Sequence, residues 1–209
     1  MKKVHLSFVL AGMLVAGFIG AGFQAQADKL GTVDLNRLIQ ESNYGVARMK
    51  ELNNQLAARK ALMDFLTLYR VATVEEAQKM RALWLKATVT EAEKAELDKL
   101  KTKIMDSDKK FNELRQRQNL TDADRELLRD YSMRTQAVEE TLTRWNQEFQ
   151  DELGASQDEA RRETLKRAKA ALAEIGKAKA FTVIFESTVA PYSANDLTED
   201  ALKAMNAKG

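Results

Sequence analysis

The stretch from residue 46 to residue 153 contains neither glycine nor proline and makes up about half of the chain. Because these two residues mark most turns and loops, their absence predicts long helices. The stretch is rich in Lys, Glu, Arg, Gln, Leu and Ala, which have high helix propensity. We therefore expect a mostly helical protein in which the chain folds back once, giving two antiparallel limbs and a tip between them.

Apolar residues recur about every 3.5 positions along both predicted limbs, which is the spacing of a coiled coil. In the first limb, over 35–70, the large apolar residues on this spacing are Leu35, Leu38, Met49, Leu52, Leu56, Met63 and Leu66. In the second limb the same spacing gives Leu128, Tyr131, Thr135, Val138, Leu142, Trp145 and Phe149. A narrow apolar stripe needs a partner, so we expect the limbs to pack together as a coiled-coil hairpin.

The tip, residues 71–126, contains four threonines that stand three positions before an acidic residue: Thr73, Thr88, Thr90 and Thr121, of which Thr88 and Thr90 offer the same helix start. This spacing is typical of the capping box at the start of a helix. It predicts helices over 74–87 and 91–118, and a second limb that starts near residue 122. The tip is therefore expected to be subdivided into shorter helices.

Three glycines mark positions where the limbs are expected to bend or end. Gly45, in the first turns of the first limb, predicts either a kink or the close approach of another backbone. Gly154, together with Ser156, is expected to interrupt the second limb, because the apolar stripe resumes out of phase after them. Gly176 is expected to end that limb.

Short extended segments are predicted on both sides of the helical region. Thr32 and Val33 suit a strand, and Asp34 after them is a candidate cap for the first limb. Residues 181–185 (FTVIF) form the clearest strand of the chain, with alternate side chains on opposite faces. That alternation predicts one shared apolar face for Phe181, Val183 and Phe185.

The last residues of the chain predict one more strand and one more helix. A short strand is expected over 188–192, where Pro191 marks an edge or an end. A final helix is expected over 198–206, capped by Asp196 or Thr198.

Residues 1–27 have the pattern of a secretory signal peptide. Lys2 and Lys3 precede an apolar run over about 6–23, and residues 25–27 (AQA) fit the small-x-small rule for cleavage. We expect export across the membrane and cleavage after Ala27. The alternative is an uncleaved membrane anchor, since the run approaches the shortest length that spans a bilayer.

The charge of the chain is balanced once the leader is set aside. With Lys2 and Lys3 removed, 31 basic and 31 acidic residues remain. Such a chain has no overall field that attracts nucleic acid, so no nucleic-acid partner is expected. Residues 161–179 hold seven Lys or Arg against two Glu. This basic segment is either a solvated helix face or a weak contact for anionic lipid headgroups.

Side chains that carry common chemistry are scarce. The chain has no cysteine, and its one histidine, His5, lies in the leader. The rest of the chain therefore lacks the commonest general base and the commonest zinc ligands. No glycine-rich phosphate loop precedes Lys177, and acidic pairs such as Glu75 and Glu76 lie on charged helix faces. We expect no enzyme activity, no catalytic residue, no metal and no cofactor.

Two pieces of sequence, one near each end of the chain, resemble the OmpH/Skp family of periplasmic chaperones. They are KLGTVDLNRLIQES, over 29–42, and AFTVIFESTVAPYSANDLTEDALKAM, over 180–205. The resemblance implies a mainly α fold with a small β part, built as a homotrimer. Residues 28–35 and 180–209 would form a small β-barrel body, and residues 36–179 a helical tentacle.

The resemblance further implies a holdase that prevents aggregation of unfolded outer-membrane proteins in the periplasm without ATP. The strand residues are too few to be buried by one chain, so the candidate trimer core is Val33, Leu35, Phe181, Val183 and Phe185. Methionine and aromatic side chains adapt to varied apolar surfaces, so the candidate client contacts are Met49, Met63, Phe65, Tyr69, Tyr131 and Trp145. The alternative function is a structural or adaptor coiled coil of the cell envelope.

Overall fold

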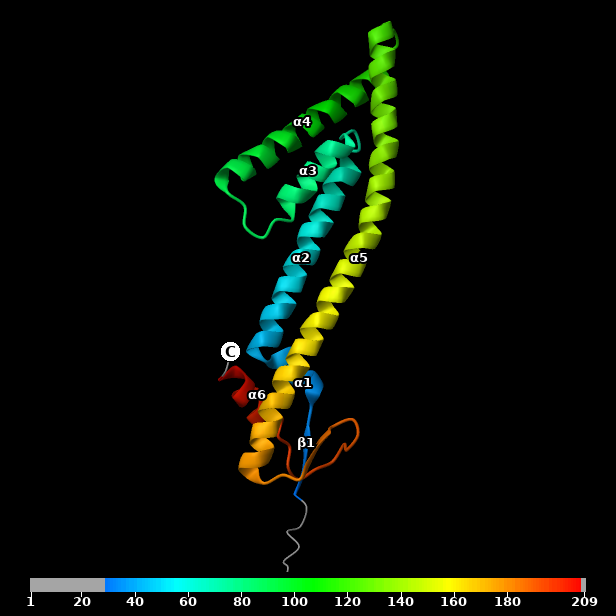
Figure 1. Cartoon of the computed structure of the whole chain (residues 1–209). Helices are drawn as coiled ribbons and strands as arrows, with labels where there is room; N and C mark the ends of the chain where they lie inside the picture. The colour runs from blue at the N-terminus through cyan, green and yellow to red at the C-terminus, as the bar shows by residue number, and fades with distance from the viewer. Residues whose placement is uncertain (1–28, 208–209) are drawn as a thin grey trace, which may run out of the picture.

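A computed structural model describes residues 29–207, which form an elongated, mostly helical molecule (Figure 1). Its axis is α5 (Asp122–Lys179), a single helix of 58 residues, which is roughly 87 Å long. This helix runs from the tip at one end of the molecule to a small body at the other. No helix within 29–207 has the apolar length needed to cross a membrane. The predicted leader, residues 1–27, lies outside the described residues.

The second long helix, α2 (Asn43–Leu68), packs along α5 and forms a hairpin with it (Figure 1). The single helix predicted over 35–70 is wrong, because α1 (Leu35–Glu41) ends before Ser42. The Ser42 hydroxyl accepts a hydrogen bond from the Gly45 amide and starts α2. A Cβ atom on Gly45 would lie 1.8 Å from the carbonyl oxygen of Ile39, so the close backbone approach predicted at this glycine is confirmed.

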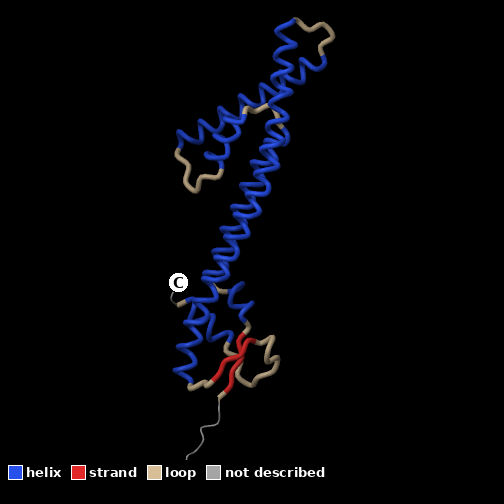
Figure 2. The backbone as a smooth tube through the Cα atoms, turned by 45° about the vertical axis from the view of Figure 1, so that its right-hand side comes forward, coloured by secondary structure: helices blue, strands red, loops and turns tan. Residues whose placement is uncertain are grey.

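Two shorter helices, α3 (Val74–Trp84) and α4 (Glu91–Gln116), form a second hairpin, which we call the arm. The arm folds back beside α2 instead of extending the tip (Figures 1 and 2). The predicted capping boxes are confirmed at all three helix starts, at Thr73, Thr90 and Thr121. The two arm helices end two or three residues earlier than the sequence predicts.

The predicted interruption at Gly154 is wrong, since α5 continues through it. A single glycine inside a helix costs only about 1 kcal/mol relative to alanine, which the packing of a long helix outweighs. The predicted end at Gly176 is wrong by three residues. The helix stops after Lys179, where Ala180 takes a left-handed conformation with φ of 56°. Gly176 still takes part in this end, because its carbonyl oxygen accepts the Phe181 amide at 2.9 Å.

The body contains a small parallel sheet of β1 (Leu30–Val33) and β2 (Val183–Glu186), drawn in red in Figure 2. Each residue of β1 pairs with one of β2, from Leu30 with Val183 to Val33 with Glu186. On its other side, Thr32 accepts the Leu197 amide at 2.8 Å and donates its own to Asn195 at 2.9 Å. Within residues 29–207, β1 is therefore enclosed on both sides and β2 is an edge strand.

The strand predicted over 188–192 is wrong, because the chain turns there. The Glu186 carboxylate accepts hydrogen bonds from the amide and hydroxyl of Thr188, and the Glu186 carbonyl accepts the Val189 amide. The final helix, α6 (Thr198–Asn206), is confirmed. The Asp196 side chain accepts the Thr198 amide at 2.9 Å, but the N-cap residue is Leu197 and no side chain caps the helix there, so the cap predicted at Asp196 or Thr198 is wrong.

Two large apolar cores lie at different heights along the main hairpin. The body core joins β1, α1 and α6 to the last turns of α5, and its buried residues are Val33, Leu38, Ala168, Ala171, Ile175, Leu197, Ala201, Leu202 and Met205. The upper core joins the arm to α2 and α5, and its buried residues are Leu62, Leu66, Ala72, Ala77, Met80, Ile104, Val138, Leu142, Trp145 and Phe149. A third, small cluster near the top of α5 holds Val71, Leu114 and Tyr131.

Candidate functional site

Several carboxylates of the described chain have a lowered pKa because they accept hydrogen bonds near helix starts. A hydrogen bond from the Lys86 ammonium, and then the amide and hydroxyl of Thr90, lower the pKa of Glu93 to about 2. Hydrogen bonds from Thr121 lower the pKa of Asp124, and those from Thr198 lower the pKa of Asp196. Residues 29–207 contain no group of three acidic or histidine side chains placed to hold a metal. Three apolar surfaces of the described chain are the candidates for a functional site.

The first apolar surface is the outer face of the edge strand. Val183 and Phe185 of β2 are 41% and 37% exposed, and Leu30 of β1 is 45% exposed. Ile184 points the other way and packs against the body core. We call Leu30, Val183 and Phe185 the outer strand face.

The five predicted trimer-core residues divide between two environments. Val33 is buried in the body core of its own chain, and Leu35 and Phe181 pack against that core. Val183 and Phe185 belong to the outer strand face. The single face predicted for residues 181, 183 and 185 is not observed, because Phe181 precedes β2 and does not follow its alternation. The Phe181 ring lies instead under the Lys29 ammonium, 4.4 Å from the ring centroid.

The second apolar surface is a cavity of about 390 Å³ near the base of the main hairpin, which we call the base groove. Its lining comes from α1, α2 and α5, and consists of Asn36, Ile39, Gly45, Arg48, Met49, Leu52, Gln157, Ala160, Arg161 and Thr164. Met49, a predicted client contact, is 54% exposed here. On the same helix, Val46 and Leu56 are each 53% exposed. Because positions three and ten apart share one flank of a helix, these side chains extend the groove along α2.

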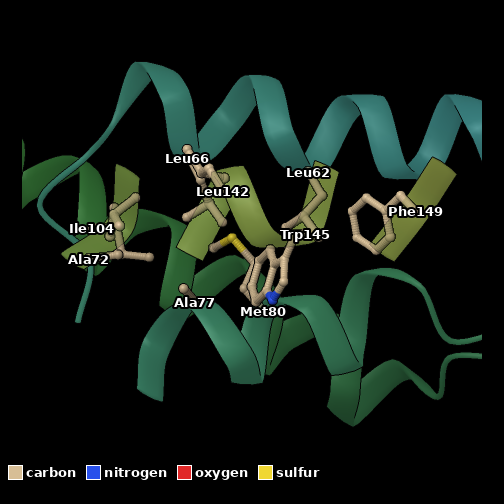
Figure 3. Packing of buried hydrophobic residues seen from close by; sticks show 10 residues of the cluster. Leu62, Leu66, Ala72, Ala77, Met80, Ile104, Leu142, Trp145 and Phe149 are labelled. Carbon is tan, nitrogen blue, oxygen red and sulfur yellow. The ribbon is translucent and has the colours of Figure 1, made fainter. Parts of the chain in front are cut away.

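The third apolar surface is the upper core, which the arm covers. Figure 3 shows Leu62 and Leu66 entering this core from α2 and Met80 entering from α3, with the Trp145 ring between them. Trp145 is only 3% exposed. Of the other predicted client contacts, Met63, Phe65 and Tyr69 pack partly buried against the same core. Phe65 and Tyr69 also contact each other, with ring centroids 4.9 Å apart.

Tyr131, the remaining predicted client contact, lies away from the others. It is 7% exposed in the small cluster near the top of α5, where its ring meets the edge of Phe111 at 5.6 Å. In this conformation Tyr131 and Trp145 are covered by the chain itself. Their contact with a client stays a prediction, and it requires the cover to move.

Charged side chains form a rim along one edge of the upper core. Arg81 of α3 donates to Glu148 at 2.5 Å and lies within 3.3 Å of Glu152, both on α5. Arg59 of α2 donates to the same Glu152 at 2.8 Å. The two guanidinium groups also lie against the Phe149 ring, with distances to its centroid of 4.7 Å for Arg81 and 5.3 Å for Arg59. This rim joins three helices, and sequence patterns alone did not indicate it.

The basic segment 161–179 occupies the part of α5 that reaches the body. Part of its charge is compensated, since Lys166 and Arg167 pair with Glu163 and Lys179 pairs with Asp200. The Arg167 guanidinium also lies 4.1 Å from the centroid of the Tyr44 ring. Contact of this segment with anionic lipid headgroups stays a prediction.

Comparison with known protein families found a match over most of the described chain. The model of a family described as outer membrane protein (OmpH-like) matches residues 29–205. The match starts just before β1 and ends within α6, so it includes the main hairpin, the arm and the body. No curated protein matches the chain.

Proposed function

The chain belongs to the OmpH-like outer membrane protein family, and from that membership we propose that it is a periplasmic chaperone that holds unfolded outer-membrane proteins. Holding an unfolded chain needs no ATP, and the sequence contains no glycine-rich loop of the kind that binds ATP phosphates. Unfolded chains expose apolar side chains that aggregate, and a holdase covers them reversibly. The proposed client surface is the base groove with its extension along α2.

The observation that carries this proposal is the exposure of large apolar side chains along one flank of α2. Val46, Met49 and Leu56 are all more than half exposed. Scattered apolar residues are normal on a protein surface, whereas an aligned set beside a groove is typical of a binding surface. Methionine is flexible, so Met49 can adapt to many client side chains. Arg48 and Arg161 also line the groove and bring positive charge to it.

For assembly, we infer a homotrimer in which β2 contributes its free edge and the outer strand face to a shared body. Two features support this inference. An edge strand with exposed apolar side chains is a natural site for pairing with another strand. A sheet of two short strands is also marginal by itself, and more strands would stabilise it. Three hairpins projecting from one body would enclose the base grooves.

The assembly is tested by light scattering on the Val183→Asp variant. A charge placed in the shared body costs several kcal/mol, so we expect monomers that keep most of their helix. The control is Val189→Asp, in the turn after β2, where the native side chain is already 72% exposed. A Val183→Asp protein that remains a trimer of unchanged stability would show that the outer strand face is not the assembly core.

Export is part of the same proposal. A periplasmic chaperone requires a leader, and we propose that residues 1–27 are removed after Ala27. The intact mass of protein taken from the envelope fraction tests this. A species that retains the leader would support the membrane-anchored alternative.

The function itself is tested by suppression of aggregation of an unfolded β-barrel membrane protein without nucleotide. Replacing Val46, Met49 and Leu56 together by serine should weaken suppression about tenfold, because three partly exposed side chains together contribute about 1–2 kcal/mol. Serine at Met133, which is 60% exposed near the top of α5, is the control and should change nothing. Suppression that requires ATP, or that survives only at low salt, would contradict capture by apolar contacts.

A further inference from the structure

The arm covers a part of the main hairpin that is held together without it. One ion pair joins α2 directly to α5, Arg59 with Glu152 at 2.8 Å, and a second, Arg70 with Glu139 at 2.5 Å, joins the turn just after α2 to α5. Leu62 and Leu66 of α2 share the upper core with Val138 and Leu142 of α5. The limbs therefore keep contacts of their own if the arm leaves, and what the arm covers is a surface in its own right.

That surface lies on two consecutive turns of α5 and combines aromatic rings with carboxylates. Trp145 and Phe149 are one turn apart, with ring centroids separated by 6.3 Å, and are 3% and 5% exposed under the arm. Glu148 and Glu152, on the neighbouring flank, are also one turn apart. We call these four residues the aromatic seat. Its chemistry suits a segment that carries a cation beside apolar side chains, since rings and carboxylates both attract a guanidinium or ammonium group.

The present occupant of the aromatic seat, α3, has this chemistry. Its buried residues are Ala77, Met80 and Leu83. Beside Met80, the Arg81 guanidinium lies 5.0 Å from the Trp145 centroid and 4.7 Å from that of Phe149. It pairs with Glu148 and Glu152 at the same time. The contact made by Ala77 and Met80 is not highly specific in shape, because alanine is small and methionine is flexible.

The arm is also built as a unit of its own. Lys79 and Glu76 of α3 pair with Glu96 and Lys103 of α4, respectively. The arm joins the rest of the molecule through two non-helical segments, 69–73 and 117–121. The ion pairs that hold it to the seat are partly exposed, since the Glu148 and Glu152 side chains are 41% and 45% accessible. Such pairs are weak and are screened by salt.

We propose that the aromatic seat is a second client-binding surface, for unfolded segments that carry Arg or Lys beside apolar residues, and that α3 occupies it until such a segment displaces it. This inference rests on the proposed chaperone function. Displacement of the arm is a competition, so the apparent affinity of the seat for a client is its intrinsic affinity reduced by the fraction of molecules with the arm open. Removing the cation from α3 should therefore strengthen client binding, whereas fixing the arm should abolish it.

The chain offers a direct signal for this competition, because its two tryptophans are Trp84 and Trp145. Trp84→Phe keeps a ring against Phe65 and leaves Trp145 as the only tryptophan. In that background, acrylamide quenching of fluorescence measures how far the aromatic seat is uncovered. The probe is a labelled synthetic peptide of alternating Leu and Arg, and its matched control is the same peptide with Glu in place of Arg.

The variant that opens the arm is Arg81→Ala. We expect quenching of Trp145 to rise at least about twofold and the Leu/Arg peptide to bind at least about threefold tighter, as follows from a larger open fraction. Arg37→Ala is the matched control, because it removes similar exposed ion pairs, with Glu41 and Glu199, that lie in the body and do not involve the arm; it should change neither quantity. The Leu/Glu peptide should gain nothing from Arg81→Ala, because Glu148 and Glu152 repel it and it does not bind the seat even when the arm is open. Unchanged quenching, or equal gains for both peptides, would overturn the proposal.

The variant that fixes the arm is Gln78→Cys with Arg144→Cys, joined by a short bismaleimide. Both residues line the same cavity between α3 and α5, and the chain has no other cysteine. We expect the cross-linked protein to lose peptide-induced changes in Trp145 fluorescence, while each single-cysteine protein keeps them. A cross-linked protein that responds to the peptide like wild type would overturn the proposal.

Two further measurements keep the outcomes separate. If Arg81→Ala loses helix by circular dichroism, the unmutated Arg81 protein is used at low and high salt, where salt should increase quenching of Trp145; no increase would count against the arm as a displaceable cover. Aggregation assays on wild type test the chaperone function independently. A protein that suppresses aggregation equally well with and without the cross-link, and binds the peptide equally, remains a chaperone that lacks a second client surface.

Discussion

The two cores of the main hairpin differ in the side chains that fill them. Both cores contain buried alanines, Ala72 and Ala77 in the upper core and Ala168, Ala171 and Ala201 in the body core, but the buried residues of the body core include no aromatic ring. Small side chains let the helix backbones come close, and little space remains for rearrangement. In the upper core, the large rings of Trp145 and Phe149 meet a methionine and an arginine. This core is filled by long side chains that can adopt other arrangements.

The edges of the two cores differ in the same sense. The body is held by part-buried hydrogen bonds: the Thr198 hydroxyl accepts the amide of the distant Asp34 at 2.9 Å and donates to the nearby Asp196 at 2.6 Å. The upper core is bordered by partly exposed ion pairs, such as Arg81 with Glu148. The difference teaches that one hairpin can carry a part with a single tight arrangement and a part suited to exchange. The following predictions test that comparison, from the largest effect to the smallest.

Gly45→Ala should destabilise the protein most. The new Cβ atom would stand 1.8 Å from the Ile39 carbonyl oxygen. That oxygen belongs to the backbone of α1, so the clash can be relieved only by moving α1 away from α2. We expect a loss of about 3 kcal/mol or more, measured by urea unfolding. A loss below about 1 kcal/mol would mean that the junction at the body is as adaptable as the upper core.

Met80→Ala should cost less and should act locally. Met80 is fully buried in the upper core, and its truncation should cost about 2–3 kcal/mol. Because the arm is joined to the hairpin at one face, the loss should appear as faster hydrogen exchange in α3 and the first half of α4. Exchange in α1 and α6 should be unchanged. Equal acceleration in the body would show that the two cores unfold together.

Gly154→Ala should stabilise the protein. The built Cβ atom meets nothing within 4 Å, and alanine is favoured over glycine inside a helix by about 0.5–1 kcal/mol. This variant is the counterpart of Gly45→Ala, because it makes the same chemical change in the part of α5 that lies between the two cores. Thermal unfolding followed by circular dichroism measures it, and a lower midpoint would contradict an open environment at Gly154.

Glu93→Gln should have the smallest effect, and that effect should depend on pH. The pKa of Glu93 is lowered from 4.5 to about 2, so the ionised carboxylate stabilises the start of α4 above about pH 4.5. The contribution is lost as the pH falls through the folded pKa, because below that value the folded state binds the proton that the unfolded state already holds. The variant should melt slightly lower than wild type at pH 6, with no difference near pH 2. Glu91→Gln, at an exposed neighbouring position, is the control for the loss of a charge.

What the sequence could predict was local. The starts of α3, α4 and α5 follow from threonines and acidic residues three positions apart, and all three were correct. The heptad stripe likewise placed Val138, Leu142 and Trp145 in an interior. These signals span only a few consecutive turns, so they can be read without knowing which distant segments pack together.

What the sequence could not predict depends on distant partners. The parallel pairing of β1 with β2 joins segments at opposite ends of the described chain. The folding of the arm back onto α5 covers Trp145 and Tyr131, whereas Met49 lines the base groove between α1, α2 and α5 and stays exposed. The rim of Arg59, Arg81 and two glutamates also forms only when three helices meet. A strand was expected over 188–192 because its residues suit one, and a single carboxylate, Glu186, turns the chain instead.

The parallel sheet has a consequence for the order in which the molecule is made. β1 is among the first described segments, yet its partner β2 begins only at residue 183. During synthesis β1 therefore has no strand to pair with until the entire main hairpin has been produced. Contacts between such distant segments form slowly unless the chain between them is already folded. Formation of α2 against α5 brings the two ends together, so we expect the helices to assemble first and the sheet to close last.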